Sequence, residues 1–477
     1  MTNSIPQTVV GGAGPAGLTA AHELAKRGIK PLVLEAGTRV GGLSRTEEYR
    51  GYRFDIGGHR FYTKAEEVQQ IWRELLGEEF LRRPRLSRIY FNHKFFNYPL
   101  SLKNVIGNLG LWESARIVLS YGYSQIRQIK PEQSFEQWVV NRFGWRLYRT
   151  FFKTYTEKVW GIPCTEIRAE WAAQRIKGLS LISAVKQALF GSNDVKSLIE
   201  EFDYPRFGPG QMWECCETRV KELGGDVELR TPVRGVRHQD GVITSISVGR
   251  DDSVREIPID QYISSVPLNQ LIESLDPPAP PAVLSAARGL KYRDFLVVAI
   301  VINQPDLFPD NWVYVHDSQA RVGRIQNFKN WSPDLVPDSS KTCLGMEYFC
   351  SEGDDIWELP DAELIQLAAQ EIENLSLART ADVEDGCVIR ALKAYPVYDG
   401  EYQGHLNVLR EYLSHFKNLQ TIGRNGMHRY NNQDHSMLCG LYAAQNLFGA
   451  KHDLWDINTE RSYYEEQRVN RSNEVSA

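Results

Sequence analysis

Apolar positions change their spacing twice within the first 35 residues. Thr8–Val10 is a short β-branched run, and residues 31–34 form a second apolar run. Between them, apolar residues recur three or four positions apart, as on one face of a helix, at Ala16, Ala20, Ala21 and Leu24. Short continuous apolar runs are typical of buried strands. The pattern predicts a strand–helix–strand unit that ends at Glu35.

Two later stretches have different patterns. Residues 90–200 are rich in aromatic residues and predict mostly helix. The i, i+3, i+4, i+7 spacing that is typical of a buried helix face occurs within this stretch, at Tyr148, Phe151, Phe152 and Tyr155. From about residue 290 to 395, short β-branched and aromatic runs predict antiparallel strands at Leu296–Val301, Trp312–His316, Arg324–Phe328 and Cys343–Phe349.

The bulk composition narrows the class of protein. A chain of 477 residues is expected to form two or three domains, and 42% hydrophobic and 24% charged residues are ordinary for a soluble globular protein. The net charge of −5 gives no reason to expect nucleic acid or an anionic membrane as a partner. The longest apolar run, Phe295–Ile302, is too short to span a bilayer, and the polar start predicts no signal peptide. Seven scattered cysteines predict reduced thiols in a cytoplasmic protein without a metal site.

The turn after the first strand carries the spacing G-x-G-x-x-G. The first glycine allows a tight turn, the second allows the backbone to approach a pyrophosphate, and the third allows close packing of helix and strand. The helix N-terminus presents unpaired N–H groups and a positive dipole end to the phosphates. A carboxylate 23 residues after the first glycine can accept hydrogen bonds from a ribose. The predicted dinucleotide contacts are Gly12, Gly14, Pro15, Ala16, Gly17 and Glu35.

A second glycine motif follows at residues 38–45. It resembles the corresponding motif of the flavoprotein group that contains amine oxidases, protoporphyrinogen oxidases and UDP-galactopyranose mutases. The resemblance implies FAD as the cofactor, with contacts at Arg39, Gly41, Gly42 and Leu43. It also implies a backbone contact between Val233 and the adenine, and a contact of Gly58 and His59 with the flavin ring near N5, because Asp-x-Gly-Gly-His resembles a mutase segment.

A second part of the chain that strongly resembles the mutases lies near the C-terminus. Residues 419–437 read as a strand, a glycine-rich bend and a new helix, with Gly-Arg-x-Gly-x-x-x-Tyr followed by Asn-Gln-Asp-His-Ser. A helix N-terminus after such a bend is suited to an anionic part of the cofactor. The resemblance implies cofactor contacts at Gly423, Arg424, Asn432, Gln433, Asp434 and Ser436.

The aromatic segment around residue 155 resembles the uridine- and diphosphate-binding helix of the mutases, although its spacing is also that of a core face. The resemblance implies that Arg175 and Arg324 oppose each other across a diphosphate. Two guanidinium groups suit that role because each presents a planar fork of donors. The implied substrate contacts are Phe151, Phe152, Tyr155, Thr156, Trp160, Arg175, Tyr314, Arg324, Tyr395, Tyr430 and Asn432.

These observations predict an α/β fold with a split Rossmann-type FAD-binding domain, a helical insertion and an antiparallel β-sheet substrate domain. The FAD-binding domain is expected at residues 1–90, 205–265 and 396–460, the helical substrate-binding domain at 91–204, the sheet domain at 266–395 and a tail at 461–477. The resemblance covers roughly residues 9–448.

The resemblance implies a mutase that interconverts pyranose and furanose forms of a nucleotide sugar, most simply a UDP-sugar, as used in cell-surface polysaccharide biosynthesis. In these enzymes N5 of the reduced flavin attacks the anomeric carbon. Arg175, Arg324 and His59 would be the catalytic residues. NAD(P)H is a candidate reductant. The sequence leaves open the nucleotide, the sugar and whether the chain forms a homo-oligomer.

Two alternatives remain open at this point. One is an oxidoreductase of the same flavoprotein group, which would oxidise an amine, a porphyrinogen or a polyene. The other is a binding protein without catalysis, like the GDP-dissociation inhibitors, which resemble these flavoproteins but do not use FAD.

Overall fold

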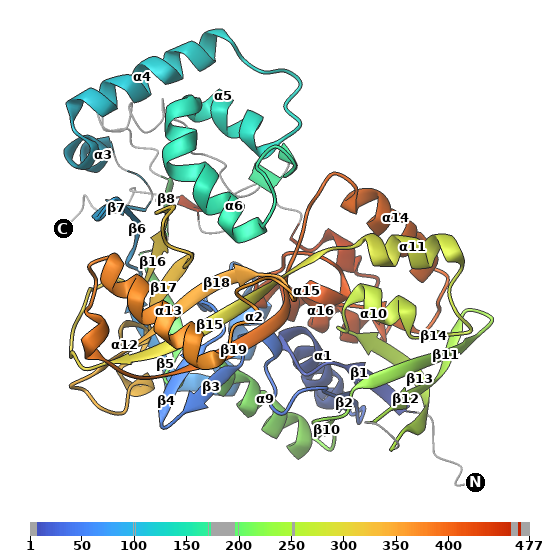
Figure 1. Ribbon diagram of the computed structural model, residues 1–477. Helices are drawn as coiled ribbons and strands as arrows, with labels where there is room; N and C mark the ends of the chain where they lie inside the picture. The colour runs from blue at the N-terminus through green and yellow to red at the C-terminus, as the bar shows by residue number, and fades with distance from the viewer. Residues whose placement is uncertain are drawn as a thin grey trace, which may run out of the picture.

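The computed structural model describes residues 7–98, 100, 102–169, 171–172, 196–198, 200–249, 253–458 and 466–468. Two large sheets form the body of the molecule, and a group of helices projects from one side of it (Figure 1). This arrangement confirms the predicted α/β class, with a split Rossmann-type unit, a helical insertion and an antiparallel sheet. The domain boundaries stay a prediction.

The first sheet, which we call the Rossmann sheet, has the strand order β10-β2-β1-β13-β12-β11-β14, with β20 beside β13. Its parallel part joins segments that are far apart in the chain: β1 (Gln7–Gly11), β2 (Leu32–Leu34), β10 (Asp226–Glu228), β13 (Arg255–Ser264) and β20 (Leu419–Thr421). The remaining strands are β11 (Val233–Gln239), β12 (Val242–Val248) and β14 (Leu275–Asp276). Because parallel strands end at one edge, this sheet brings the glycine-rich turn and the C-terminal motif together.

Helices cover the Rossmann sheet. Helix α1 (Pro15–Lys26) packs against both α9 (Pro209–Glu222) and α16 (Gln433–Asn446). The close approach of α1 and α16 depends on Gly440, where an added Cβ would lie 2.1 Å from the carbonyl oxygen of Ala16. The predicted apolar face of α1 is buried, including Ala20, Ala21 and Leu24 at 0% exposure.

The second sheet, which we call the substrate sheet, has the order β19-β15-β18-β17-β16-β6-β7. The four strands that the sequence predicts are present as β15 (Tyr292–Ile302), β16 (Trp312–Val315), β17 (Arg324–Asn327) and β18 (Thr342–Cys350). The sequence analysis did not anticipate the other three, β6 (Ser87–Phe91), β7 (Lys94–Asn97) and β19 (Val383–Pro396). All neighbours are antiparallel except β16 and β6.

The projecting helices, which we call the helical unit, follow β7 directly (Figure 1). They are α3 (Leu102–Leu109), α4 (Leu111–Ile126), α5 (Phe135–Leu147), a π-helical turn (Tyr148–Lys153) and α6 (Thr154–Trp160). Side chains from this unit share one apolar cluster with the substrate sheet, in which Phe151 and Trp160 accompany Phe295 and Val297. The unit is therefore joined to the body through packing beside the predicted site.

Shorter elements complete the fold. Strands β3 (Thr46–Tyr49) and β4 (Tyr52–Asp55) form a hairpin, β5 (Phe80–Pro84) pairs with β9 (Glu201–Pro205), and β8 (Lys196–Leu198) pairs with β21 (Glu466–Arg468). The other helices are α2 (Glu66–Leu76), α10 (Leu268–Glu273), α11 (Pro281–Gly289), α12 (Phe328–Trp331), α13 (Asp361–Asn374), α14 (Tyr402–Leu413) and α15 (Gly423–Gly426). Short 3₁₀ turns occupy Gly42–Ser44, Gly77–Glu79, Pro333–Leu335, Thr380–Asp382 and Leu454–Asp456.

Over the described ranges, no helix combines the length and the apolar character that a membrane crossing requires. The same ranges contain no group of three or more His, Cys, Asp or Glu side chains placed to hold a metal ion.

Candidate active site

The glycine-rich turn lies between β1 and α1 and contains glycines of two kinds. Gly12 has φ +96°, and an added Cβ at Gly17 would lie 1.9 Å from the carbonyl oxygen of Gly12. Both positions therefore need glycine for the fold itself. Gly14 differs, because its φ is −81° and an added Cβ would come no nearer than 3.8 Å to the protein, at Gly42. The space above Gly14 is thus left for a ligand.

The second glycine motif folds back over this turn. Gly41 has φ +101°, and its N–H donates to the carbonyl of Ala13 at 2.8 Å. Gly42 faces Gly14, and a Cβ on Gly42 would lie 3.2 Å from Gly14 Cα. Pro15 is the first residue of α1. Leu43 packs on the apolar cluster that the helical unit shares with the substrate sheet. Arg39 is exposed. The two predicted motifs therefore meet at the N-terminus of α1.

Glu35 holds this turn in place. Its carboxylate accepts hydrogen bonds from the backbone N–H groups of Ala13, at 2.8 Å, and Gly37, at 2.7 Å. The backbone carbonyl of Glu35 accepts from Thr231 N–H at 2.7 Å. Val233 follows two residues later at the start of β11. The structure therefore brings Glu35 and the segment before Val233 together, as contacts to one nucleoside require.

His59 follows a loop of two glycines. Gly57 has φ +83°, and a side chain on Gly58 would lie 3.0 Å from Gln326 of the substrate sheet. His59 Nδ1 lies 2.9 Å from the carbonyl oxygen of Gly57. A carbonyl can only accept, so Nδ1 carries the proton. Burial, together with the positive charges of Arg424 and Arg324, lowers the pKa of His59 to about 3. The ring is therefore neutral, and its Nε2 is a hydrogen-bond acceptor.

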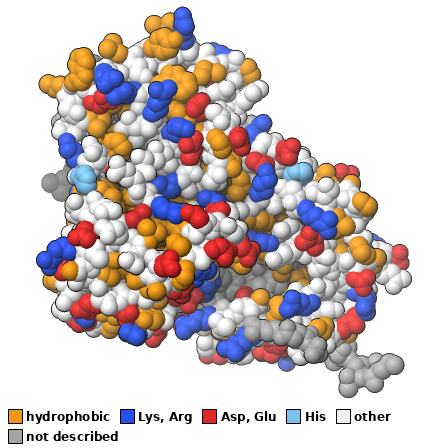
Figure 2. Space-filling view, viewed as in Figure 1, with side chains coloured by type: hydrophobic (Ala, Val, Ile, Leu, Met, Phe, Trp, Pro, Cys, Tyr) orange, Lys and Arg blue, Asp and Glu red, His pale blue; other side chains and the backbone are white. Residues whose placement is uncertain are grey.

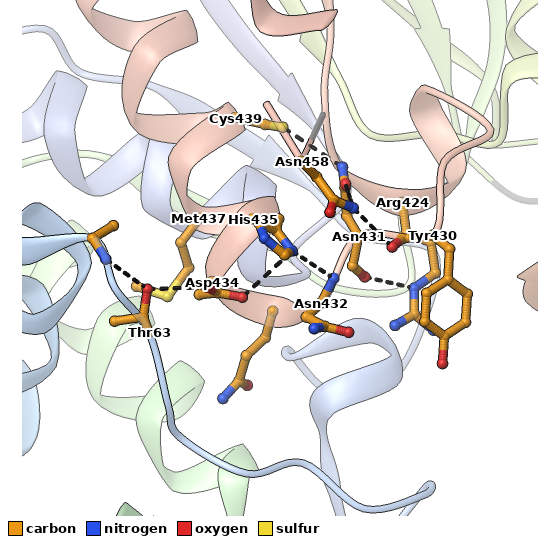
Figure 3. A network of polar contacts seen from close by, with 12 residues as sticks. Thr63, Arg424, Tyr430, Asn431, Asn432, Asp434, His435, Met437, Cys439 and Asn458 are labelled. Atoms are coloured by element: carbon orange, nitrogen blue, oxygen red, sulfur yellow. Dashed lines mark hydrogen bonds and ion pairs between the residues drawn. The ribbon is translucent and has the colours of Figure 1, made fainter. Parts of the chain in front are cut away.

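The C-terminal motif forms a polar network at the N-terminus of α16 (Figure 3). Asp434 is 2% exposed and accepts a hydrogen bond from the Thr63 hydroxyl at 2.9 Å. Asn432 N–H donates to His435 Nδ1 at 3.4 Å, and the Gln433 amide donates to the carbonyl of Arg60 at 3.4 Å. Gly423 has φ +78° and packs on Ala16, and Ser436 is buried. The network ties α16 to the segment that carries His59.

Arg324 on β17 is anchored by a buried carboxylate. Its Nε donates to Glu347, which is fully buried on the neighbouring strand β18, and its Nη2 donates to the Tyr395 hydroxyl at 2.8 Å. Glu347 also accepts from the Gln326 amide at 2.8 Å. The Glu347 carboxylate keeps the pKa of Arg324 raised despite its burial. These contacts use Nε and Nη2, and no hydrogen bond within the described residues uses Nη1.

Two stacked tyrosine rings lie next to two guanidinium groups. The rings of Tyr395 and Tyr430 are 5.6 Å apart and 16° from parallel. Arg424 lies 4.7 Å from the Tyr430 ring centroid and donates to the carbonyls of Asn431 and Ala394 at 2.9 and 3.0 Å. Arg324 bonds to the Tyr395 hydroxyl. We call Arg324, Tyr395, Tyr430 and Arg424 the arginine–tyrosine cluster.

Aromatic residues of α6 extend this cluster toward the helical unit. The ring of Trp160 is 6.4 Å from Tyr395 and 6.3 Å from Tyr430. Tyr155 stacks on His316 at 4.7 Å, with 5° between the rings, and meets Tyr314 edge-on at 5.6 Å. Ring contacts therefore form two groups among the predicted residues, Tyr155 with Tyr314 and Trp160 with Tyr395 and Tyr430.

Other predicted substrate contacts lie deeper. Phe151 is 3% exposed and packs on Phe96 at 5.0 Å. Phe152 packs on Phe143 at 5.1 Å, and Thr156 is 6% exposed. These contacts match the core-face interpretation of the spacing more closely than a direct ligand contact. Arg175 lies outside the described residues.

The sequence analysis missed three residues that support this site. Glu347 anchors Arg324, and His316 forms the platform under Tyr155. Lys158 donates to the carbonyls of Val315, Asp317 and Val322 at 3.0–3.2 Å, which fastens α6 to the substrate sheet. A single acidic residue in the apolar run of β18 was the available signal for Glu347, because buried carboxylates need a partner.

Two family models match the chain. A model described as an NAD(P)-binding Rossmann-like domain matches residues 9–75. A model described as a flavin-containing amine oxidoreductase matches residues 206–430. The two matches cover the glycine motifs at one end and β17 with the start of the C-terminal motif at the other.

Two relatives match this chain over part of their length. A dTDP-fucopyranose mutase of Escherichia coli is 29% identical over 167 residues, which is 33% of this chain and 42% of that protein. A putative flavin-containing monoamine oxidase of Mycobacterium tuberculosis is 25% identical over 288 residues, which is 57% of this chain and 60% of that protein. The chain thus aligns with less than two thirds of either relative.

Solved structures share the whole fold. A reduced UDP-galactopyranose mutase superposes with a TM-score of 0.83 at 21% identity and covers 96% of this chain and 100% of its own. A putative protoporphyrinogen oxidase from Exiguobacterium superposes with a TM-score of 0.70 at 17% identity, over 93% and 99%. The predicted resemblance to mutases and related flavoproteins is confirmed, and at these identities the structures establish the fold.

Proposed function

We propose that this chain is an FAD-dependent nucleotide-sugar mutase, similar to UDP-galactopyranose mutase, that interconverts the pyranose and furanose forms of its substrate. The observation that carries the proposal is the arginine–tyrosine cluster beside His59. It offers cationic and hydroxyl groups next to the flavin side of the predicted FAD site, as a sugar diphosphate requires.

The glycine motifs fit the cofactor. The open space above Gly14 at the N-terminus of α1 would take the pyrophosphate, and Glu35 with the segment before Val233 would take the adenosine. Gly58 and His59 would lie along the flavin ring. Bound and reduced, FAD supplies a nucleophilic nitrogen that can displace the diphosphate from the anomeric carbon.

Arg324 would stabilise the charge that develops on the leaving diphosphate. Glu347 fixes one edge of the guanidinium, so that Nη1 is held toward the substrate without rearrangement. Tyr395, Tyr430 and Tyr155 would position the sugar and phosphates, with Trp160 behind them. Arg175 keeps its proposed role as the second diphosphate ligand.

His59 would act through its neutral ring. With the proton fixed on Nδ1 by Gly57, Nε2 can accept a hydrogen bond from an N–H or O–H group in the site. Because its pKa is lowered to about 3, this acceptor persists across the working pH range.

Amine oxidation is the second candidate, because the amine oxidoreductase model matches residues 206–430. The cluster opposes it in two ways. Rings stacked at 5.6 Å leave no space for a substrate between Tyr395 and Tyr430, and the two nearby guanidinium groups would repel a protonated amine.

A substrate panel tests the proposal. The purified protein is reduced without oxygen, with dithionite and in parallel with NAD(P)H, and incubated with UDP-, dTDP- and GDP-sugars before chromatography of the products. We expect one nucleotide sugar to give an isomer of identical mass. If every nucleotide sugar is inert and a primary amine reduces the oxidised flavin, amine oxidation replaces the proposal.

A further inference from the structure

Helix α4 exposes an apolar face to solvent. Leu111 is 80%, Leu119 74% and Ile126 86% exposed, and the other large exposed side chains of this helix are Trp112, Val118 and Tyr123. With the small residues Ala115 and Gly122, these positions recur every three or four residues along the helix. We call them the α4 stripe. Apolar side chains gather on the edge of the molecule where α4 lies, with Lys and Arg side chains among them (Figures 1 and 2).

The opposite side of α4 makes the contacts with the protein. Ile117 and Ser124 are buried at 4% and 2% exposure, and the Ser120 hydroxyl accepts from Arg146 N–H of α5 at 3.0 Å. The Gln125 amide donates to the carbonyl of Asn141 at 2.6 Å. A surface helix normally directs its polar face to water, so α4 is reversed relative to the usual pattern.

The charged groups beside the α4 stripe are cationic. Arg116 lies on α4, Arg127 is its C-cap residue, and Lys130 follows three residues later. All three side chains are exposed. Glu113, the single acidic residue of α4, is engaged by Arg146 of α5 through both carboxylate oxygens and lies 3.5 Å from Arg116, so one acidic group is shared by two cations. The stripe is therefore bordered by positive charge.

The whole helical unit shares this sign. Residues 102–160, from α3 to α6, contain 9 Lys and Arg but only 4 Asp and Glu, whereas the full chain contains 55 and 60. The net charge of −5 for the chain conceals a basic unit attached to an acidic body.

We propose that the α4 stripe is a docking surface for an anionic lipid membrane, on which the helix lies in the plane of the headgroups. Apolar side chains would enter the acyl boundary, and Arg116, Arg127 and Lys130 would contact lipid phosphates. Trp112 and Tyr123, near the two ends of the stripe, have the amphipathic rings that favour this boundary. A second copy of the chain is disfavoured as the occupant, because it would bring two basic units together. This proposal does not depend on the proposed enzyme activity.

Flotation with lipid vesicles tests the proposal. The full-length protein is mixed with vesicles of phosphatidylcholine alone or of phosphatidylcholine with phosphatidylglycerol, at low and high salt. We expect binding to the anionic vesicles only, weakened by salt because the cationic contacts are screened. Leu119→Glu combined with Ile126→Glu should weaken binding at least tenfold, and Arg116→Gln combined with Arg127→Gln should weaken it on anionic vesicles.

Val408→Glu is the matched control, because Val408 is an exposed aliphatic residue on another helix, α14. It should leave vesicle binding unchanged, and melting temperatures should show that each variant is folded. Equal flotation of the α4 and control variants would overturn the proposal. So would dimers that the α4 variant abolishes, found without vesicle binding, because the occupant would then be a second copy.

Discussion

The Rossmann sheet and the helical unit show two ways in which a sequence places a site. Around α1, the backbone places the ligand contacts. Gly12 and Gly17 are required by the turn itself, and Gly14 is left open above it. In the helical unit, side chains with the same spacing meet different surroundings. Phe151 packs in the core on Phe96, whereas Tyr155, four residues later, stacks on His316 beside the site.

This difference shows when a sequence motif alone is enough to predict a residue of the site. A turn that needs glycine carries its geometry in the local sequence. An aromatic residue on a helix does not, because both core and site residues follow the same 3.6-residue period. Its role depends on partners from distant strands. Mutations in the two regions should therefore impair the protein in different ways.

The largest effect is expected at Gly14. Gly14→Val should fold, because the protein leaves room for a side chain there, but lose flavin by about three decades in affinity, or roughly 4 kcal/mol. Gly17→Val should instead lower the melting temperature, because its Cβ would collide with the carbonyl of Gly12. Flavin content and circular dichroism measure both. Gly404→Val, on α14 with open space around it, is the control. A yellow Gly14→Val protein would contradict the cofactor site.

In the helical unit, Phe151→Ala should cost about 3–5 kcal/mol of stability, because it removes a buried aromatic ring. Phe151→Leu, which keeps most of the volume, should leave the KM for substrate unchanged. Tyr155→Phe should raise the KM for substrate while the stability stays nearly normal. Denaturant unfolding and steady-state kinetics separate the two. A raised KM for Phe151→Leu at normal stability would return Phe151 to the substrate contacts.

Arg324→Ala should reduce turnover by two to three decades, roughly 2–4 kcal/mol, while the flavin spectrum is retained. Arg324→Lys should restore part of the activity, because a point charge lacks the fork that bonds Glu347 and Tyr395. Arg321→Ala, which removes an exposed ion pair with Asp355, is the matched control. Normal turnover in Arg324→Ala would exclude this residue from the site.

Tyr395→Phe should have a smaller effect than Arg324→Ala. It removes one hydrogen bond to Arg324 but keeps the ring stacked on Tyr430, so we expect a loss of about 1–2 kcal/mol in kcat/KM. Tyr412→Phe, on α14, serves as the control. A loss as large as that of Arg324→Ala would show that the hydroxyl itself takes part in the chemistry.

The smallest effect on activity is expected at the buried Asp55, which precedes the His59 loop and should instead change how stability depends on pH. Burial raises the pKa of Asp55 from 3.8 to about 8. The folded state therefore binds more protons than the unfolded state between about pH 4 and 8. The stability from this group is full below about pH 4 and is lost progressively as the pH rises to about 8. Asp55→Asn should flatten this dependence in denaturant titrations. An unchanged profile would contradict it.

Much of the fold follows from local patterns. The strand–helix–strand unit and the strands β15 to β18 were predictable because their periodicity is strong. Strand β19 was not, since its 14 residues include Gly386 and Lys393, the latter at φ +53°, which interrupt the pattern. Strands β6 and β7 lie close to charged residues in the sequence, and β6 joins the sheet by pairing with the distant β16, while β7 pairs with β6.

The sequence allowed prediction of those site residues that lie in recognisable motifs. Arg324, Tyr395, Tyr430 and Arg424 were named from a resemblance, and the structure brings them into one cluster. Glu347 and His316 were missed, because only the folded sheet places them against Arg324 and Tyr155. The basic residues beside the exposed α4 stripe were not evident from the net charge of the whole chain.

The count of electrons per turnover tests the central claim most directly. The protein is reduced once without oxygen, excess reductant is removed, and the nucleotide sugar that the panel identifies is added while flavin absorbance and product are followed together. Since pyranose and furanose forms have the same oxidation state, we predict many turnovers with the flavin still reduced, and none with oxidised protein. Stoichiometric bleaching of oxidised flavin by that substrate, with no isomer formed by the reduced protein, would contradict the account.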